Sequence, residues 1–168
     1  MRGLRKLDAD ASLYLRTRTM PAYLRWAAEL FTHTGDYWLW ALGLVIVWAI
    51  GNQQWKEWAM IYFVGIVLVV AVVAPIKFMV RRQRPEAASG SLYHKADPHS
   101  FPSGHAARVT LIATLSWQLA PLWMAVLLVA WAVVVALLRV ALGVHYLSDV
   151  LVGGLLGLVI GYALGPFL

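Results

Sequence analysis

The sequence predicts an all-α fold: an integral-membrane helical bundle of about five transmembrane helices, preceded by an amphipathic interfacial helix. Hydrophobic residues make up 61% of the 168 residues and charged residues only 13%, whereas soluble domains carry about 25% charged residues. The apolar residues also gather in five stretches separated by polar breaks, as in proteins that span the bilayer several times. We expect one domain, residues 1–168, with the amphipathic segment at 1–32 and the helical core at 33–168.

The N-terminal segment mixes apolar and charged side chains. Residues 1–10 are charged and lack an apolar core, so we expect no cleavable signal peptide. Residues 12–32 combine large apolar side chains with Arg16, Arg18, Arg25 and Glu29. Arginine is unfavourable at mid-bilayer depth, and Pro21 would start or kink a helix. We therefore predict an amphipathic helix lying in the membrane interface, with a first membrane span as the alternative.

Five apolar stretches follow, and each predicts a membrane-spanning helix. They lie at residues 37–50, 58–76, 105–119, 121–142 and 150–168. The first is short for a hydrocarbon layer of about 30 Å. The third and fourth belong to one long apolar run that Pro121 divides into a hairpin.

Small residues recur in the last stretch. Every fourth residue is a glycine, at Gly153, Gly157, Gly161 and Gly165. Such a ridge lets another helix approach closely. We favour packing within the chain, and a homodimer contact is the alternative.

The chain is basic, with a formal net charge of +6, and contains no cysteine. The lack of cysteine excludes a disulfide framework and a thiolate metal site. Nucleic acid would explain the basic charge, but no basic stripe on a soluble fold accompanies it. Anionic lipid headgroups and phosphate groups are the better partners, and we expect no nucleic-acid partner.

Ionisable residues lie at the ends of apolar stretches in three places, and in a membrane protein such residues indicate function. The first cluster is Lys77, six intervening residues, and Arg84-Pro85. If the second helix continues past Ile76, then Lys77, Arg81 and Arg84 share a helix face and can hold a phosphate. The alternative is that these cations reach for lipid headgroups.

The second cluster is Pro102-Ser103-Gly104-His105, at the start of the third apolar stretch. Ser103 is a good N-cap, and Gly104 lets the backbone approach a ligand closely. The unpaired N–H groups of a helix start form an anion site, beside which His105 can exchange a proton. An ordinary helix cap with an interfacial histidine is the alternative.

The third cluster is Arg139, five intervening residues, His145, three more, and Asp149. His145 and Asp149 are spaced to share a helix face. A carboxylate bonded to one ring nitrogen fixes the tautomer and leaves the other nitrogen as a nucleophile. A helix connection with a capping Asp149 is the alternative, although Arg139 within an apolar run argues against it.

Together, in this order and spacing, the three clusters resemble the type 2 phosphatidic acid phosphatase superfamily over roughly residues 32–168. The family pattern is Lys-x₆-Arg-Pro, Pro-Ser-Gly-His and Ser-Arg-x₅-His-x₃-Asp. Leu138 departs from it, because the family usually has Ser there. The resemblance implies a lipid phosphate phosphatase in which His145 attacks phosphorus, Asp149 orients His145, and His105 protonates the leaving oxygen and then activates water.

The resemblance also implies the phosphate ligands, which are Lys77, Arg84, Ser103, the Gly104 amide and Arg139. Three cations can supply the charge that metal ions supply in other phosphoryl-transfer sites. The sequence has no Asp/Glu cluster with metal-ligand character. We therefore expect metal independence, no metal site and no cofactor.

The resemblance leaves the lipid open. The candidates are phosphatidylglycerophosphate, phosphatidic acid and polyprenyl phosphates or diphosphates, and the loop at 86–100 is expected to help choose among them. The other classes considered are a small transporter or channel, a vanadate haloperoxidase-like enzyme and an inactive scaffold. One assay separates them: phosphate release from a lipid phosphate in detergent, inhibited by vanadate.

Charge also predicts the orientation in a cell (inner) membrane. If residues 12–32 lie in the interface, the N-terminus and the catalytic loops share one side. The basic residues of the N-terminal segment are Arg2, Arg5, Lys6, Arg16, Arg18 and Arg25, and Lys56 alone lies on the other side. The positive-inside rule then puts the site at the cytoplasmic face. If residues 12–32 span instead, the site faces outward and recycling of an undecaprenyl-diphosphate type carrier becomes the alternative function.

Overall fold

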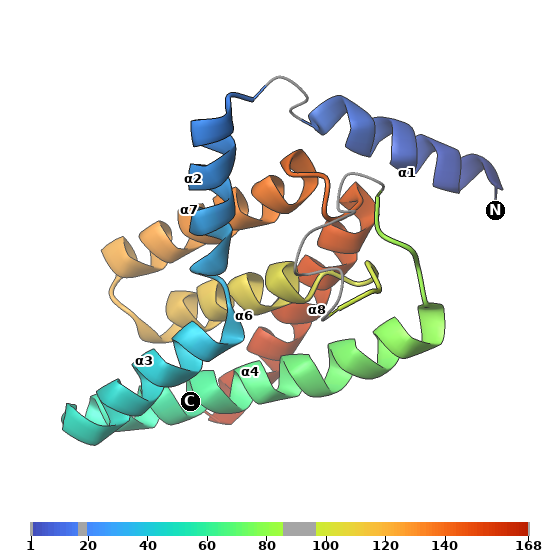
Figure 1. Cartoon of the computed structure of the whole chain (residues 1–168). Coiled ribbons are helices and arrows are strands. Elements are labelled where there is room, and N and C mark those ends of the chain that lie inside the picture. Colours follow the sequence, from blue (N-terminus) through green and yellow to red (C-terminus); the bar gives the residue numbers. More distant parts are fainter. Residues whose placement is uncertain (1, 17–19, 86–96, 168) are drawn as a thin grey trace.

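The computed structural model describes residues 2–16, 20–85 and 97–167, and these ranges are helical apart from short connections. The helices are α1 (Arg2–Leu15), α2 (Ala22–His33), α3 (Tyr37–Ile50), α4 (Gln53–Val80), α6 (Gly104–Leu119), α7 (Leu122–Ala141) and α8 (Leu147–Leu164), followed by the 3-10 turn η2 (Gly165–Phe167). The predicted helical bundle is confirmed (Figure 1).

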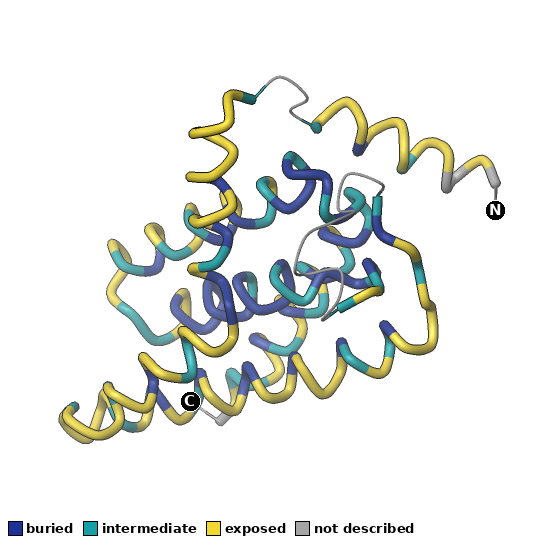
Figure 2. The backbone as a smooth tube through the Cα atoms, in the orientation of Figure 1, coloured by how far each residue is buried: buried dark blue, intermediate teal, exposed yellow. Residues whose placement is uncertain are grey.

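Helix α6 forms the centre of the bundle. It packs against α8, α7 and α4, and ten of its residues, 106–109 and 111–116, are buried (Figure 2). Ser103 caps its start by accepting a hydrogen bond from the Ala106 amide. The cluster Pro102–His105 therefore lies at the start of the central helix.

The glycines of α8 let α8 lie directly against α6. A Cβ atom added at Gly153 would lie 2.4 Å from the Ser103 carbonyl oxygen, and one added at Gly157 would lie 2.0 Å from the Ala107 carbonyl oxygen. Gly161 faces Thr114 of α6 in the same way. The ridge thus packs within the chain, the first of the two interpretations that the sequence left open.

All five predicted apolar helices are present. The bounds of α3 match the prediction, and α4 is longer at both ends than residues 58–76. Among the described residues, α4, α7 and α8 are long and apolar enough to cross a membrane, and α3 is a shorter apolar helix. Helix α6, with 16 residues, is buried in the bundle.

The N-terminal segment differs from the prediction of one amphipathic helix over residues 12–32. It forms two helices, α1 and α2, and Pro21 is the N-cap of α2. The physical reason is that proline fits a helix start and cannot continue a preceding helix. In Figure 1, α2 runs across the direction of α4 and α6. This direction suits a helix lying in the interface.

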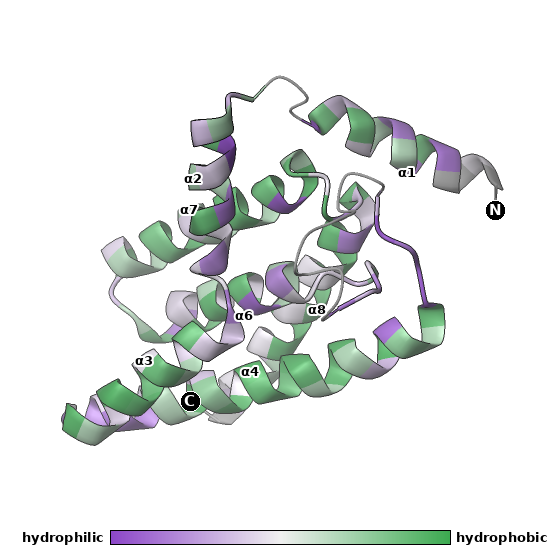
Figure 3. Ribbon diagram, viewed as in Figure 1, coloured by the Kyte–Doolittle hydropathy of each residue, from purple (hydrophilic) through white to green (hydrophobic). Residues whose placement is uncertain are grey.

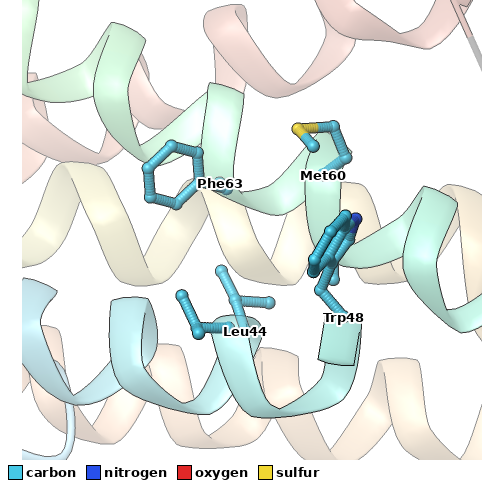
Figure 4. A pocket seen from close by; sticks show the side chains of 6 residues that line it. Leu44, Trp48, Met60 and Phe63 are labelled. Carbon is cyan, nitrogen blue, oxygen red and sulfur yellow. The ribbon is translucent and has the colours of Figure 1, made fainter. Parts of the chain in front are cut away.

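The outer faces of α3 and α4 are apolar (Figure 3). Leu44 and Trp48 of α3 and Ala59, Met60 and Phe63 of α4 line an outward groove of about 280 Å³ (Figure 4). This groove contains no ionisable side chain. It is a surface suited to hydrocarbon, separate from the polar residues at the other end of α4.

Candidate active site

A cavity of about 710 Å³ lies at one end of the bundle. The three sequence clusters meet there, although they are up to 68 positions apart in the chain. The predicted site residues that line it are Lys77, Arg84, Gly104, His105, Arg139 and His145. The start of α3 and residues 69–74 of α4 complete its wall and give the cavity an apolar side.

Backbone geometry brings His145 into the cavity. The Arg139 carbonyl at the end of α7 accepts hydrogen bonds from the amides of Val144 and His145, at 3.2 and 3.1 Å. Gly143 has φ of 70°, a left-handed conformation that glycine adopts without strain. The turn between α7 and α8 therefore holds the His145 ring beside Arg84, one of the predicted phosphate ligands.

The partners of His145 assign its tautomer. Nδ1 lies 2.8 Å from the Ser100 carbonyl oxygen, which can only accept, so Nδ1 carries the proton. Nε2 lies 3.2 Å from Nη1 of Arg84, which can only donate, so Nε2 has the lone pair. The ring is fully buried, and burial followed by the positive charges of Arg139 and Arg84 lowers the pKa of His145 well below its ordinary value. Nε2 is thus an unprotonated nitrogen at neutral pH.

Asp149 supports His145 from a greater distance than the sequence suggested. Its Oδ2 lies 3.6 Å from Nδ1 of His145, and the nearer partner of Nδ1 is the Ser100 carbonyl. The Asp149 oxygens instead accept from the Tyr146 amide at 2.9 Å and from Arg82 Nη1 at 2.8 Å. The reason is that His145 precedes α8, so the two residues do not share a face of one helix.

Two cations converge on one point in the cavity. Oδ2 of Asp97 lies 2.5 Å from Lys77 Nζ and 3.0 Å from Arg84 Nη2. An anionic oxygen thus already fits between these cations. The Asp97 side chain is 40% exposed, so it can move away when another anion enters. Sequence reasoning gave Asp97 no role.

The predicted common face of Lys77, Arg81 and Arg84 is wrong. Helix α4 ends at Val80, and Arg81 is its C-cap in the left-handed conformation, with φ of 49°. Arg81 is exposed and its Nε donates to the Phe78 carbonyl. Arg84 reaches the cavity through an extended segment, in which Gln83 pairs with His99.

His105 has a carboxylate partner that the sequence analysis missed. Its Nε2 lies 2.7 Å from Oδ1 of Asp36, and Oδ2 of the same carboxylate lies 2.7 Å from Nδ1 of His33. Partial burial opposes ionisation of Asp36, but the hydrogen bonds from His105 and His33 outweigh it and hold the pKa of Asp36 well below its ordinary value. The available signal was a carboxylate directly before the apolar run 37–50.

Within the Pro-Ser-Gly-His cluster, Ser103 has a structural role, whereas Gly104 and His105 line the cavity. Ser103 is fully buried, caps α6, and donates its amide to the Asp149 carbonyl at 2.9 Å. Gly104 and His105 line the cavity, whereas Ser103 is not among the lining residues. Leu138, the position that departs from the family pattern, lies in α7.

The loop at 86–100, which is expected to help choose the headgroup, lies mostly outside the described residues. Within the described ranges, no group of three His, Asp or Glu side chains is placed to hold a metal ion.

The sequence and the fold were compared with known proteins. A family model described as the PAP2 superfamily matches residues 58–167. Decaprenylphosphoryl-5-phosphoribose phosphatase of Mycobacterium tuberculosis is 36% identical over 136 residues, which are 80% of this chain and 75% of that protein. An undecaprenyl-diphosphatase of Sulfolobus acidocaldarius is 36% identical over 103 residues, 56% of this chain and 50% of that protein.

Two solved structures share the fold. LpxE of Aquifex aeolicus aligns with a TM-score of 0.77 at 23% identity, covering 94% of this chain and 93% of that one. A transmembrane PAP2-type phosphatidylglycerolphosphate phosphatase from Bacillus subtilis aligns with a TM-score of 0.81 at 24% identity, covering 99% and 87%. At these identities the likeness concerns the fold alone.

Proposed function

The chain belongs to the PAP2 superfamily, and from this premise we propose that it is a multi-pass membrane phosphatase that hydrolyses a lipid phosphate through a phosphohistidine intermediate. The observation that carries the mechanism is His145, whose partners leave Nε2 unprotonated beside Arg84. A neutral imidazole held among cations can attack an anionic phosphorus that those cations bind.

The reaction has two steps. Nε2 of His145 forms a bond to phosphorus while the bond to the leaving oxygen breaks, and His105 gives that oxygen a proton. His105 then takes a proton from water, which attacks the phosphohistidine and restores His145 while phosphate leaves. Lys77, Arg84 and Arg139 neutralise the phosphate oxygens in both steps.

We propose a polyprenyl-linked phosphate as the substrate class, ahead of phosphatidylglycerophosphate and phosphatidic acid. Support comes from the mycobacterial relative, whose name gives a decaprenylphosphoryl sugar phosphate as its substrate. The cavity of about 710 Å³ has room for a polar headgroup beside its apolar wall. A diphosphate is the second candidate, favoured by the relative named as an undecaprenyl-diphosphatase.

The test is phosphate release from a panel of these lipids in detergent micelles. His145→Ala should abolish turnover, and His105→Ala should slow it by at least about 10²-fold, the usual loss of a general acid–base group. With ³²P-labelled substrate, His105→Ala should accumulate acid-labile label on the protein. Wild-type protein that releases no phosphate from any of these lipids would contradict the proposal, as would an active His145→Ala variant.

Metal independence is part of the proposal. The clustered cations supply positive charge at the phosphate position, so EDTA should leave the rate nearly unchanged. Vanadate should inhibit, because it mimics five-coordinate phosphorus. Activity that disappears with EDTA and returns with Mg²⁺ would show that a metal takes part.

For location, we propose the cell inner membrane with the site at the cytoplasmic face. Support comes from α1, a basic amphipathic helix whose Asp8 and Ser12 contact the start of α8 on the catalytic side.

For assembly, we propose that the glycine ridge is not a homodimer contact, because α6 of the same chain already covers it.

A further inference from the structure

Helix α1 touches the catalytic core through two side chains one turn apart. Oγ of Ser12 accepts from the Leu147 amide at 2.8 Å, and Oδ1 of Asp8 accepts from the Ser148 amide at 3.0 Å. Leu147 and Ser148 are the first residues of α8, whose amides have no partner within their own helix. An N-terminal helix thus caps the helix that follows the predicted nucleophile.

Arg82 connects this contact to the interior. Its Nη2 lies 2.6 Å from Oδ2 of Asp8, and its Nη1 lies 2.8 Å from Oδ1 of Asp149. Nη1 also donates to Oγ of Ser148 at 2.7 Å, and the guanidinium lies 3.9 Å from the centre of the Tyr146 ring. The Arg82 side chain is only 22% exposed, so solvent screens these contacts weakly.

Asp149 depends on this arginine for charge balance. Its side chain is fully buried, and Arg82 is the cation that contacts it. When the cation paired with a buried carboxylate is removed, the carboxylate changes position, becomes protonated or is hydrated by incoming water. Because Asp149 lies 3.6 Å from Nδ1 of His145, any such change alters the electrostatic environment of the nucleophile.

We propose that Asp8 and Arg82 are positioning residues for the phosphatase reaction, so that α1 sets the orientation and charge of Asp149 and, through it, of His145. This proposal rests on the proposed function. The ion pair is persistent at neutral pH: burial alone would raise the pKa of Asp8, but the hydrogen bonds from Ser148 and Arg82 lower it overall.

The chain offers matched controls for both residues. Asp10 is an exposed aspartate on the same helix, and Arg81 is the exposed arginine next to Arg82. We expect Asp8→Asn and Arg82→Lys each to lower kcat about tenfold or more, the usual size of effects on groups that orient a site ligand. KM should change less than about twofold, and Asp8→Glu should retain more activity than Asp8→Asn. Asp10→Asn and Arg81→Lys should stay within about twofold of wild type.

The two variants should also be coupled. Because Asp8 acts through Arg82, the double variant should lose no more than about twofold beyond the worse single variant. Multiplying effects would mean two independent structural roles and would overturn the proposal. So would a kcat for Asp8→Asn equal to that for Asp10→Asn.

An NMR measurement of the histidine rings tests the proposed role of α1 without an activity assay. In protein labelled with ¹⁵N-histidine, the His145 ring signals, assigned with His145→Gln, should shift in Asp8→Asn and Arg82→Lys but not in the two controls. Unmoved His145 signals would overturn the role of α1. Wild-type protein without phosphatase activity would instead contradict the proposed function, and the ring signals would still report on α1.

Discussion

At the residue scale, His145 and His105 differ in the partner that holds the imidazole ring. His145 donates to a neutral carbonyl and lies among cations, whereas His105 donates to the Asp36 carboxylate. Cationic surroundings favour a neutral ring, which suits a nucleophile. A carboxylate stabilises an imidazolium, which suits a proton donor. The two rings thus differ in their nearest partner, as the proposed roles of nucleophile and proton donor require.

The Asp36 contact predicts a defect in proton donation. Asp36→Asn keeps the shape of the side chain but removes the charge that stabilises protonated His105, so kcat on a lipid phosphate should fall about 10- to 10²-fold. A substrate with a good leaving group, such as p-nitrophenyl phosphate, should lose less because its leaving oxygen needs no proton. His33→Gln is the control and should have the smaller effect. Equal losses on both substrates would contradict a role in proton donation.

The environment of His145 predicts the acid side of the pH profile. Protonation of Nε2 removes the nucleophile, and the pKa of His145 lies well below its ordinary value of about 6.5. The loss of kcat/KM caused by His145 should therefore begin only below pH 6.5 as the pH falls. Rates from pH 4.5 to 8, corrected for the ionisation of the substrate phosphate, check this. A midpoint at or above 6.5 would contradict it.

The position of Asp97 between Lys77 and Arg84 predicts competition with anions. Asp97→Asn removes the negative charge that these cations already hold, so vanadate and inorganic phosphate should inhibit about three- to tenfold more tightly. Inhibition constants measured against the same substrate report the change. An unchanged constant would mean that the Asp97 contact is not in the way of the anion.

At the scale of elements, the closeness of α8 and α6 predicts the effect of a single methyl group. Gly157→Ala would put a Cβ atom 2.0 Å from the Ala107 carbonyl oxygen, so the helices must separate and stability should fall by about 1–3 kcal/mol. Gly154→Ala is the matched control on the same helix, because its nearest contact is an ordinary 3.5 Å. Thermal unfolding in detergent measures both, and equal melting temperatures would contradict this packing.

The helices themselves were predictable to the extent that their ends carry local signals. The bounds of α3 followed from the extent of the apolar run 37–50, and Pro121 correctly separated α6 from α7. The end of α4 did not follow, because Arg81 stops the helix in a conformation unusual for arginine. The sequence analysis predicted one helix where the structure has α1 and α2. Residues before position 12 are polar, and their contacts with the start of α8 are not visible in the sequence.

The candidate site was predictable where its residues form spaced motifs and unpredictable where partners are distant in sequence. Lys77, Arg84 and His145 could be assigned from spacing and meet in one cavity. The contacts of Asp36 with His105 and of Asp8 with Arg82 join residues 69 and 74 positions apart. A single sequence carries no signal for such pairs, since each residue alone is an ordinary charge near a helix end.

At the scale of the whole molecule, the proposed orientation can be measured directly in this cysteine-free chain. Arg81 and Gln54 are exposed at opposite ends of α4, so single cysteines there report the two sides of the membrane. In intact spheroplasts, an impermeant maleimide should label Gln54→Cys, and should label Arg81→Cys only after permeabilisation. The reverse pattern would place the catalytic side outward and favour carrier recycling.

The central helix α6 also has a consequence for how the protein is made. It carries Arg108 and Ser116, polar groups that hydrocarbon alone cannot satisfy. Arg108 donates to the Gly35 carbonyl, and Ser116 bonds Tyr62 of α4 at 2.7 Å. Both partners are synthesised before α6. These two polar groups of the central helix therefore have partners that leave the ribosome before it, and α7 and α8 can pack against a helix whose Arg108 and Ser116 side chains are already hydrogen-bonded.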